Sequence, residues 1–121
     1  VIGDRGTLHQ RKGAEVLLAM PPFDLVLVDG NHSMEAVAEE IAALDANPPL
    51  IIVGHDVCST AAGYPYCDGA AHLHQHLRDA GWLITIDAED RVGEATKRGM
   101  MVATRDADIH QIATDTWLMT T

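Results

Sequence analysis

The sequence predicts an α/β fold with a parallel central sheet, and three observations in the first half of the chain predict it. The segment from Phe23 to Asp29 (FDLVLVD) is a nearly continuous apolar run, as expected for a strand buried on both faces. Ser33 can cap a following helix, in which apolar residues recur at helical spacing as far as Leu44. A second apolar run covers residues 50–53. Strand, helix and strand in this order form the βαβ unit of a parallel sheet.

The remaining segments add elements around this unit. The helix after Ser33 should turn Glu35, Glu39 and Glu40 toward water, because they alternate with its apolar positions. Further on, the pattern predicts a loop over residues 57–69 and a helix over 70–80 that ends at Gly81. Two strands, 82–86 and 100–104, follow and are joined by an acidic stretch over 87–99. Near the start of the chain, residues 8–20 predict a weaker helix. Residues 106–121 carry no decisive pattern.

Size and composition exclude several classes of protein. A chain of 121 residues is long enough for one compact domain and too short for two ordinary ones. A net charge of −10 repels nucleic acid and anionic membrane surfaces, so neither is an expected partner. No apolar run approaches the roughly 20 residues of a membrane helix, and the first residues do not have the pattern of a signal peptide, which predicts a cytoplasmic protein. Cys58 and Cys67 match no standard zinc spacing and should be reduced thiols.

Acidic residues stand at the end of both predicted strands. Asp29 ends the first strand and Asp56 ends the second, and parallel neighbours present their carboxyl ends side by side, so the two carboxylates can share one cation. His32 and His55 should lie in the same crevice. Oxygen ligands favour Mg²⁺, Ca²⁺ or Mn²⁺, and imidazole ligands add Zn²⁺ and Fe²⁺. The alternatives are structural: Asp29 can belong to a turn, and His32 or Asp56 can cap a helix.

These residues carry a resemblance to a known family. The stretch FDLVLVDGNHS, residues 23–33, followed by IIVGHD, residues 51–56, resembles the carboxyl-terminal half of a class I S-adenosylmethionine-dependent methyltransferase. Within that fold it is most similar to the metal-dependent sugar and macrolide O-methyltransferases. The resemblance implies a mostly parallel, Rossmann-like sheet with helices on its faces and an antiparallel edge hairpin, to which the strands after Gly81 and Gly99 correspond.

The resemblance also implies roles for individual residues. Asp29, His55 and Asp56 correspond to metal ligands, with Mg²⁺ or Mn²⁺ expected, and His32 corresponds to the general base. Asp4 corresponds to a contact of the cofactor's adenine, with a turn formed by Gly3 and Asp4 as the alternative, and Asp29 is also expected beside the cofactor. The implied reaction transfers a methyl group from S-adenosylmethionine to a metal-chelated hydroxyl of a sugar or another small molecule.

The sequence departs from the family where the cofactor binds. Gly3, Gly6 and Gly13 do not form the Gly-rich turn that approaches the cofactor, and no acidic residue ends a strand where the ribose would bind. We therefore expect an incomplete methyltransferase-like domain that lacks the amino-terminal half, with an unpaired sheet edge that a second copy of the chain covers in a homodimer. The alternatives are a metal-binding or oligomerisation module without catalysis, and a metal-dependent hydrolase that uses the same carboxylates and imidazoles.

Two further groups of residues stay open at this point. His72 and His76 lie four residues apart on a predicted helix and can bind one metal, whereas a solvated helix face is the plainer interpretation; His74 points elsewhere. In the loop before this helix, Cys58 and Cys67 can complete a zinc site with these histidines if the loop folds back. The same loop holds three residues able to contact an acceptor, with ordinary loop packing as the alternative: Tyr64, Tyr66 and Asp68.

Overall fold

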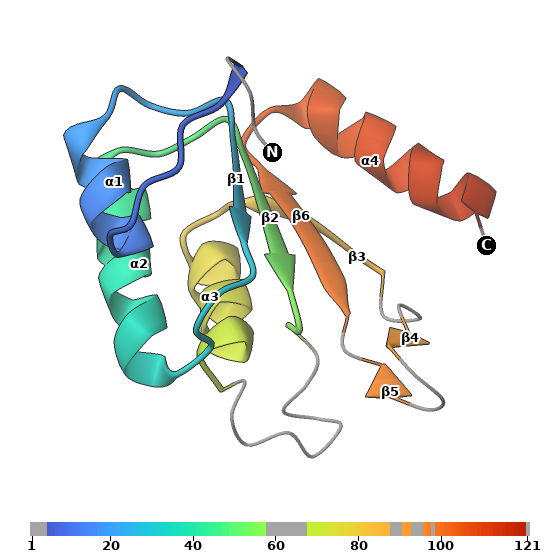
Figure 1. Ribbon diagram of the computed structural model, residues 1–121. Helices are drawn as coiled ribbons and strands as arrows, with labels where there is room; N and C mark the ends of the chain where they lie inside the picture. The colour runs from blue at the N-terminus through green and yellow to red at the C-terminus, as the bar shows by residue number, and fades with distance from the viewer. Residues whose placement is uncertain (1–4, 58–67, 88–90, 93–95, 98, 121) are drawn as a thin grey trace.

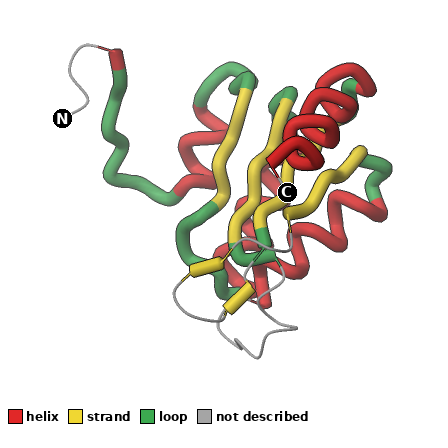
Figure 2. The backbone as a smooth tube through the Cα atoms, turned by 90° about the vertical axis from the view of Figure 1, so that its right-hand side faces the viewer, coloured by secondary structure: helices red, strands yellow, loops and turns green. Residues whose placement is uncertain are grey.

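The computed structural model describes residues 5–57, 68–87, 91–92, 96–97 and 99–120. Its centre is a four-stranded mixed sheet in the order β1-β2-β6-β3. Helices α1, α2 and α3 lie on one side of this sheet and α4 lies on the other, as Figures 1 and 2 show. The elements are α1 (Gly13–Ala19), β1 (Leu25–Val28), α2 (Met34–Ala46), β2 (Ile51–His55), α3 (Asp68–Asp79), β3 (Leu83–Asp87), β4 (Arg91–Val92), β5 (Thr96–Lys97), β6 (Met100–Thr104) and α4 (Ala107–Thr120).

The predicted βαβ unit is confirmed. β1 and β2 pair in parallel, with Leu25 opposite Ile51 and Val28 opposite Gly54. Ser33 caps α2 as predicted, because its hydroxyl accepts a hydrogen bond from the amide of Ala36.

The sheet is mixed, with β1, β2 and β3 running in one direction and β6 in the other. Of the three strand pairs in this sheet only β1 with β2 is parallel, since β6 enters between β2 and β3 and runs antiparallel to both. The two predicted strands of the second half do pair antiparallel with each other, as expected, and β3 lies at the edge. The coarser description, an α/β fold with an open mixed sheet and helices on both faces, holds.

The core lies between the sheet and the side that carries α1, α2 and α3. Side chains alternate along each strand, so Ile52, Met101 and Ala103 point to this side and are fully buried. They meet the apolar faces of α2 and α3, including Leu44 and Leu77. This packing fixes the position of the loops at the carboxyl ends of β1 and β2 relative to α3.

The first strand is not buried on both faces, in contrast to the prediction from its continuous apolar run. Leu25 and Leu27 are 52% and 60% exposed, whereas Val28 is buried. The reason is the position of β1 at the edge of the sheet, since α4 on that side of the sheet packs mainly over β3 and β6.

Other boundaries differ from the predicted ones. The first helix is shorter, Gly13–Ala19, and a short β4–β5 hairpin occupies part of the predicted acidic connection. The unassigned tail forms α4, where the carboxylate of Asp106 accepts hydrogen bonds from the amides of Asp108 and Ile109, as an N-cap residue does. No helix in the described part of the chain is long and apolar enough to cross a membrane.

Candidate functional site

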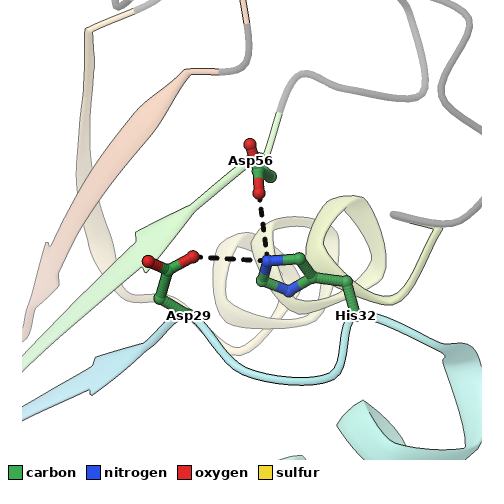
Figure 3. A group of neighbouring side chains, drawn as sticks. All are labelled: Asp29, His32 and Asp56. Carbon is green, nitrogen blue, oxygen red and sulfur yellow. Dashed lines mark ion pairs between the residues drawn. The ribbon is translucent and has the colours of Figure 1, made fainter. Parts of the chain in front are cut away.

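Asp29 and Asp56 lie together at one edge of the sheet. Asp29 directly follows β1 and Asp56 directly follows β2, and the parallel register aligns the ends of the two strands. The expected meeting of the two carboxylates therefore follows from the pairing of two adjacent parallel strands. Figure 3 shows both side chains directed toward His32, which lies between them.

His32 is carried by the turn between β1 and α2. The amide of Ser33 donates to Oδ1 of Asn31, which is local turn chemistry, and Ser33 then begins the helix. This turn places Nε2 of His32 3.4 Å from Oδ1 of Asp29 and 3.1 Å from Oδ2 of Asp56. One ligand atom from each of Asp29, His32 and Asp56 lies within 4.8 Å of those of the other two.

His55, the last residue of β2, completes the predicted group. Its Nδ1 lies 3.5 Å from Oδ1 of Asp29 and 3.3 Å from Oδ1 of Asp56. All four residues that the sequence predicts for the crevice are thus neighbours, with the two imidazoles on different oxygens of Asp56.

The donor set and its spacing fit a divalent cation. Metal–ligand bonds of about 2.1 Å that meet at right angles put neighbouring ligand atoms roughly 3.0 Å apart. The distances from His32 Nε2 to the two carboxylates, 3.1 and 3.4 Å, are close to that value. Two carboxylates with an imidazole suit Mn²⁺, Mg²⁺, Zn²⁺ or Fe²⁺ rather than a soft metal.

Burial makes this group unusual for a surface loop. The side chains of Asp56 and His32 are only 7% and 9% exposed, whereas that of Asp29 is 49% exposed. Within the described residues, the buried Nδ1 of His32 has no hydrogen-bond partner. A buried carboxylate such as that of Asp56 needs compensating charges or donors; the two imidazoles lie within 3.3 Å of it, and a cation shared with Asp29 would add another.

Asp56 also has an uncommon backbone conformation. Its φ is 60°, and it is the one non-glycine residue with positive φ in the described part of the chain. Aspartate and asparagine tolerate the left-handed region better than most residues, but the conformation is still costly. Such strain often occurs at functional positions, where the side chain must point in one direction.

Among the described residues, His72, His74 and His76 do not belong to a group that could hold a metal ion. Nε2 of His76 pairs with Asp45 at 3.0 Å, and His74 lies 2.8 Å from the guanidinium of Arg78. Burial, followed by the nearby charge of Arg78, lowers the pKa of His74. Among the described residues, Asp29, His32 and Asp56 are the one group of three or more such side chains close enough to hold an ion.

Several predicted site residues fall outside the described part of the chain. These are Asp4, Cys58, Tyr64, Tyr66 and Cys67, whose predicted roles stay predictions. Asp68 begins α3 and is exposed.

Sequence reasoning missed two features beside the site. Glu40, expected to face water, is half-buried, and desolvation raises the pKa of its carboxyl group, a shift that the charge of His32 opposes. A groove of about 1010 Å³ runs along the edge of β1 that pairs with no other strand in the described part of the chain; it reaches Asp29 and is also lined by α1 and the first half of α2. The position of Glu40 beside Val37 and Ile41, which form the buried stripe, is a signal that could have indicated its burial.

Comparison with known proteins gives no family for this chain. No family model, no curated protein and no solved structure matches it.

Proposed function

We propose that Asp29, His32 and Asp56 form a divalent-cation site, and that this site serves a methyltransferase that uses S-adenosylmethionine and methylates a hydroxyl group. The observation that carries the proposal is the placement of two carboxylates and an imidazole, two of them buried, at the ends of adjacent parallel strands. In this proposal the chain contributes the metal and acceptor side of the enzyme.

The fold and the groove support the methyltransferase part. The antiparallel pair of β3 and β6 beside β2 is the arrangement that the resemblance implies for the carboxyl-terminal half of such a domain. Ligand pockets usually measure about 300–1,000 Å³, so the groove beside β1 is large enough for a cofactor, and its lining includes Asp29. This part of the proposal depends on the sequence resemblance.

The chain's own residues would divide the work as follows. Asp29, His32 and Asp56 hold the ion, which when bound lowers the pKa of hydroxyls that it chelates. His55 lies within 3.5 Å of both carboxylates and can accept the proton that the acceptor hydroxyl loses. This division exchanges the roles of the two histidines that the resemblance implies, because it is Nε2 of His32 that groups with both aspartates.

Calorimetric titration with Mn²⁺ tests the assignment of the two histidines. We expect His32→Ala to lower Mn²⁺ affinity at least tenfold, as for loss of a ligand, and His55→Ala to leave it within about threefold and to abolish methyl transfer. Unchanged affinity in His32→Ala, with loss of transfer, would return His32 to the role of base. A chain that binds no Mn²⁺, Mg²⁺ or Zn²⁺ would refute the cation site.

A titration with S-adenosylmethionine, with and without Mn²⁺, tests the methyltransferase part separately. Saturable binding supports it. Clear metal binding without any cofactor binding would leave the cation site and show that this chain by itself does not form the cofactor site.

A second candidate function is a metal-binding module that associates through its sheet edge. The observation that favours it is the free edge of β1, the terminal strand among those described, beside the exposed Leu25 and Leu27. Sedimentation of the chain and of Leu27→Lys tests it: a dimer that the lysine variant dissociates supports this candidate, and a monomer refutes it.

A further inference from the structure

The first turn of α3 is in direct backbone contact with the turn that carries His32. The amide of Gly69 donates a hydrogen bond of 2.9 Å to the carbonyl oxygen of His32. Gly69 is buried at this contact, and α2 and α3 pack against each other. The first turn of α3, which comes after β2 and Asp56 in the chain, therefore holds the turn after β1 and Asp29.

This contact leaves no room for a side chain at position 69. A Cβ atom there would lie 2.5 Å from the carbonyl oxygen of His32, 2.6 Å from that of Ser33 and 2.6 Å from Cγ2 of Val37. Carbon and carbonyl oxygen ordinarily approach to about 3.3 Å, so the backbone of the His32 turn or of α3 would have to move by roughly 0.8 Å. Two of the three obstacles are backbone atoms, which cannot rotate away.

We propose that Gly69 is a positioning residue for His32, an inference that rests on the proposed cation site. Nδ1 of His32 has no hydrogen-bond partner in the described part of the chain, so apart from the contacts of Nε2 with the two carboxylates the ring is positioned through its own backbone, whose carbonyl oxygen accepts the hydrogen bond from Gly69. A metal site tolerates deviations of about 0.2 Å in its ligand distances, much less than the displacement that a methyl group at position 69 requires. The absence of a side chain at Gly69 thus sets the position of Nε2 between Asp29 and Asp56.

Gly69→Ala tests this inference, with Gly30→Ala as the matched control. Gly30 lies next to Asp29, but a Cβ there would meet nothing within 4 Å. We expect Gly69→Ala to weaken Mn²⁺ binding by about tenfold or more in a calorimetric titration, and Gly30→Ala to change it by less than about twofold. Alanine favours a helix over glycine, so weaker binding in Gly69→Ala would not result from a loss of helix propensity in α3.

The ring resonances of His32 in the metal-free proteins separate positioning from general stability. We expect them to shift in Gly69→Ala and to stay in place in Gly30→Ala. Wild-type Mn²⁺ affinity or unshifted His32 resonances in Gly69→Ala would overturn the inference. If the unmodified chain binds no Mn²⁺, the proposed function fails, and the resonances of the metal-free variants still decide the position of His32.

A measurement on the unmodified chain covers the case in which Gly69→Ala does not fold. When Mn²⁺ holds the His32 ring in place, it also holds the backbone carbonyl oxygen of His32, to which the amide of Gly69 donates its hydrogen bond. Saturating Mn²⁺ should therefore slow hydrogen exchange of the Gly69 amide about tenfold or more. An exchange rate that Mn²⁺ does not change would overturn the inference.

Discussion

Asp56→Asn should remove metal-dependent stability while it leaves the metal-free fold nearly unchanged. Asparagine has almost the same shape as aspartate and, like aspartate, tolerates the left-handed φ of 60° at this position. The variant loses one of the two carboxylates that the proposed site offers, and the lost carboxylate is the buried one. The substitution therefore separates the charge of Asp56 from its conformation.

The size of the effect follows from ligand linkage. A ligand at a hundred times its Kd stabilises the folded state by about 2.7 kcal/mol, which for a domain of this length raises Tm by roughly 10 °C. Loss of a ligand carboxylate should weaken binding at least about 100-fold, since even residues that only support the ligands account for up to that factor. At the same Mn²⁺ concentration the variant then gains about 0.4 kcal/mol, or roughly 2 °C.

Thermal unfolding with and without Mn²⁺ is the assay. Asp108→Asn, an exposed carboxylate at the start of α4, is the control and should show the full rise of the unmodified chain. An equal rise in Tm for Asp56→Asn and the unmodified chain would refute the assignment of Asp56 as a ligand. A fall of more than about 8 °C without metal would show that the carboxylate has a structural role.

Three further predictions concern the fold around the site. Burial raises the pKa of Glu40 above its ordinary 4.5, so the folded state disfavours the charged form and stability falls as pH rises through and beyond that value. Glu40→Gln should therefore have a higher Tm than the unmodified chain at pH 7, and this difference in Tm should disappear below pH 4. A variant whose Tm equals that of the unmodified chain at both pH values would contradict this. Asn47→Ala should cost about 1–2 kcal/mol in urea denaturation, because the side-chain amide donates to the carbonyl groups of Leu17 and Met20 at the end of α1; an unchanged urea midpoint would show that water replaces these bonds. Leu77→Ala should cost about 2–5 kcal/mol, since this side chain is almost fully buried, and a loss below 1 kcal/mol would mean that the core closes around the gap.

The parts of the fold that could be predicted are those whose sequence features lie within a few residues of the element that they predict. The cap at Ser33, the stop at Gly81 with its φ of 87° and the strand at Met100–Thr104 are local features of this kind. The N-cap at Asp106 is equally local and would have identified the last helix.

The order of the strands in the sheet and the burial of their faces were less predictable. A continuous apolar run indicates a strand but not its neighbours, so the edge position of β1 and the exposure of Leu27 were missed. The insertion of β6 between β2 and β3 depends on pairing between segments far apart in the chain, for which a short strand carries no signal of its own.

The sequence by itself determined that Asp29 and Asp56 end two strands and that a helix between them makes these strands parallel neighbours. Chain direction and strand pairing are enough to bring their carboxylates to one edge. Only the tertiary structure decided how the two imidazoles are placed against these carboxylates and what holds His32 in its position. That depends on the packing of α3 against the His32 turn, where Gly69 meets a carbonyl group 37 positions earlier in the chain, and contacts of that kind arise from the folded core.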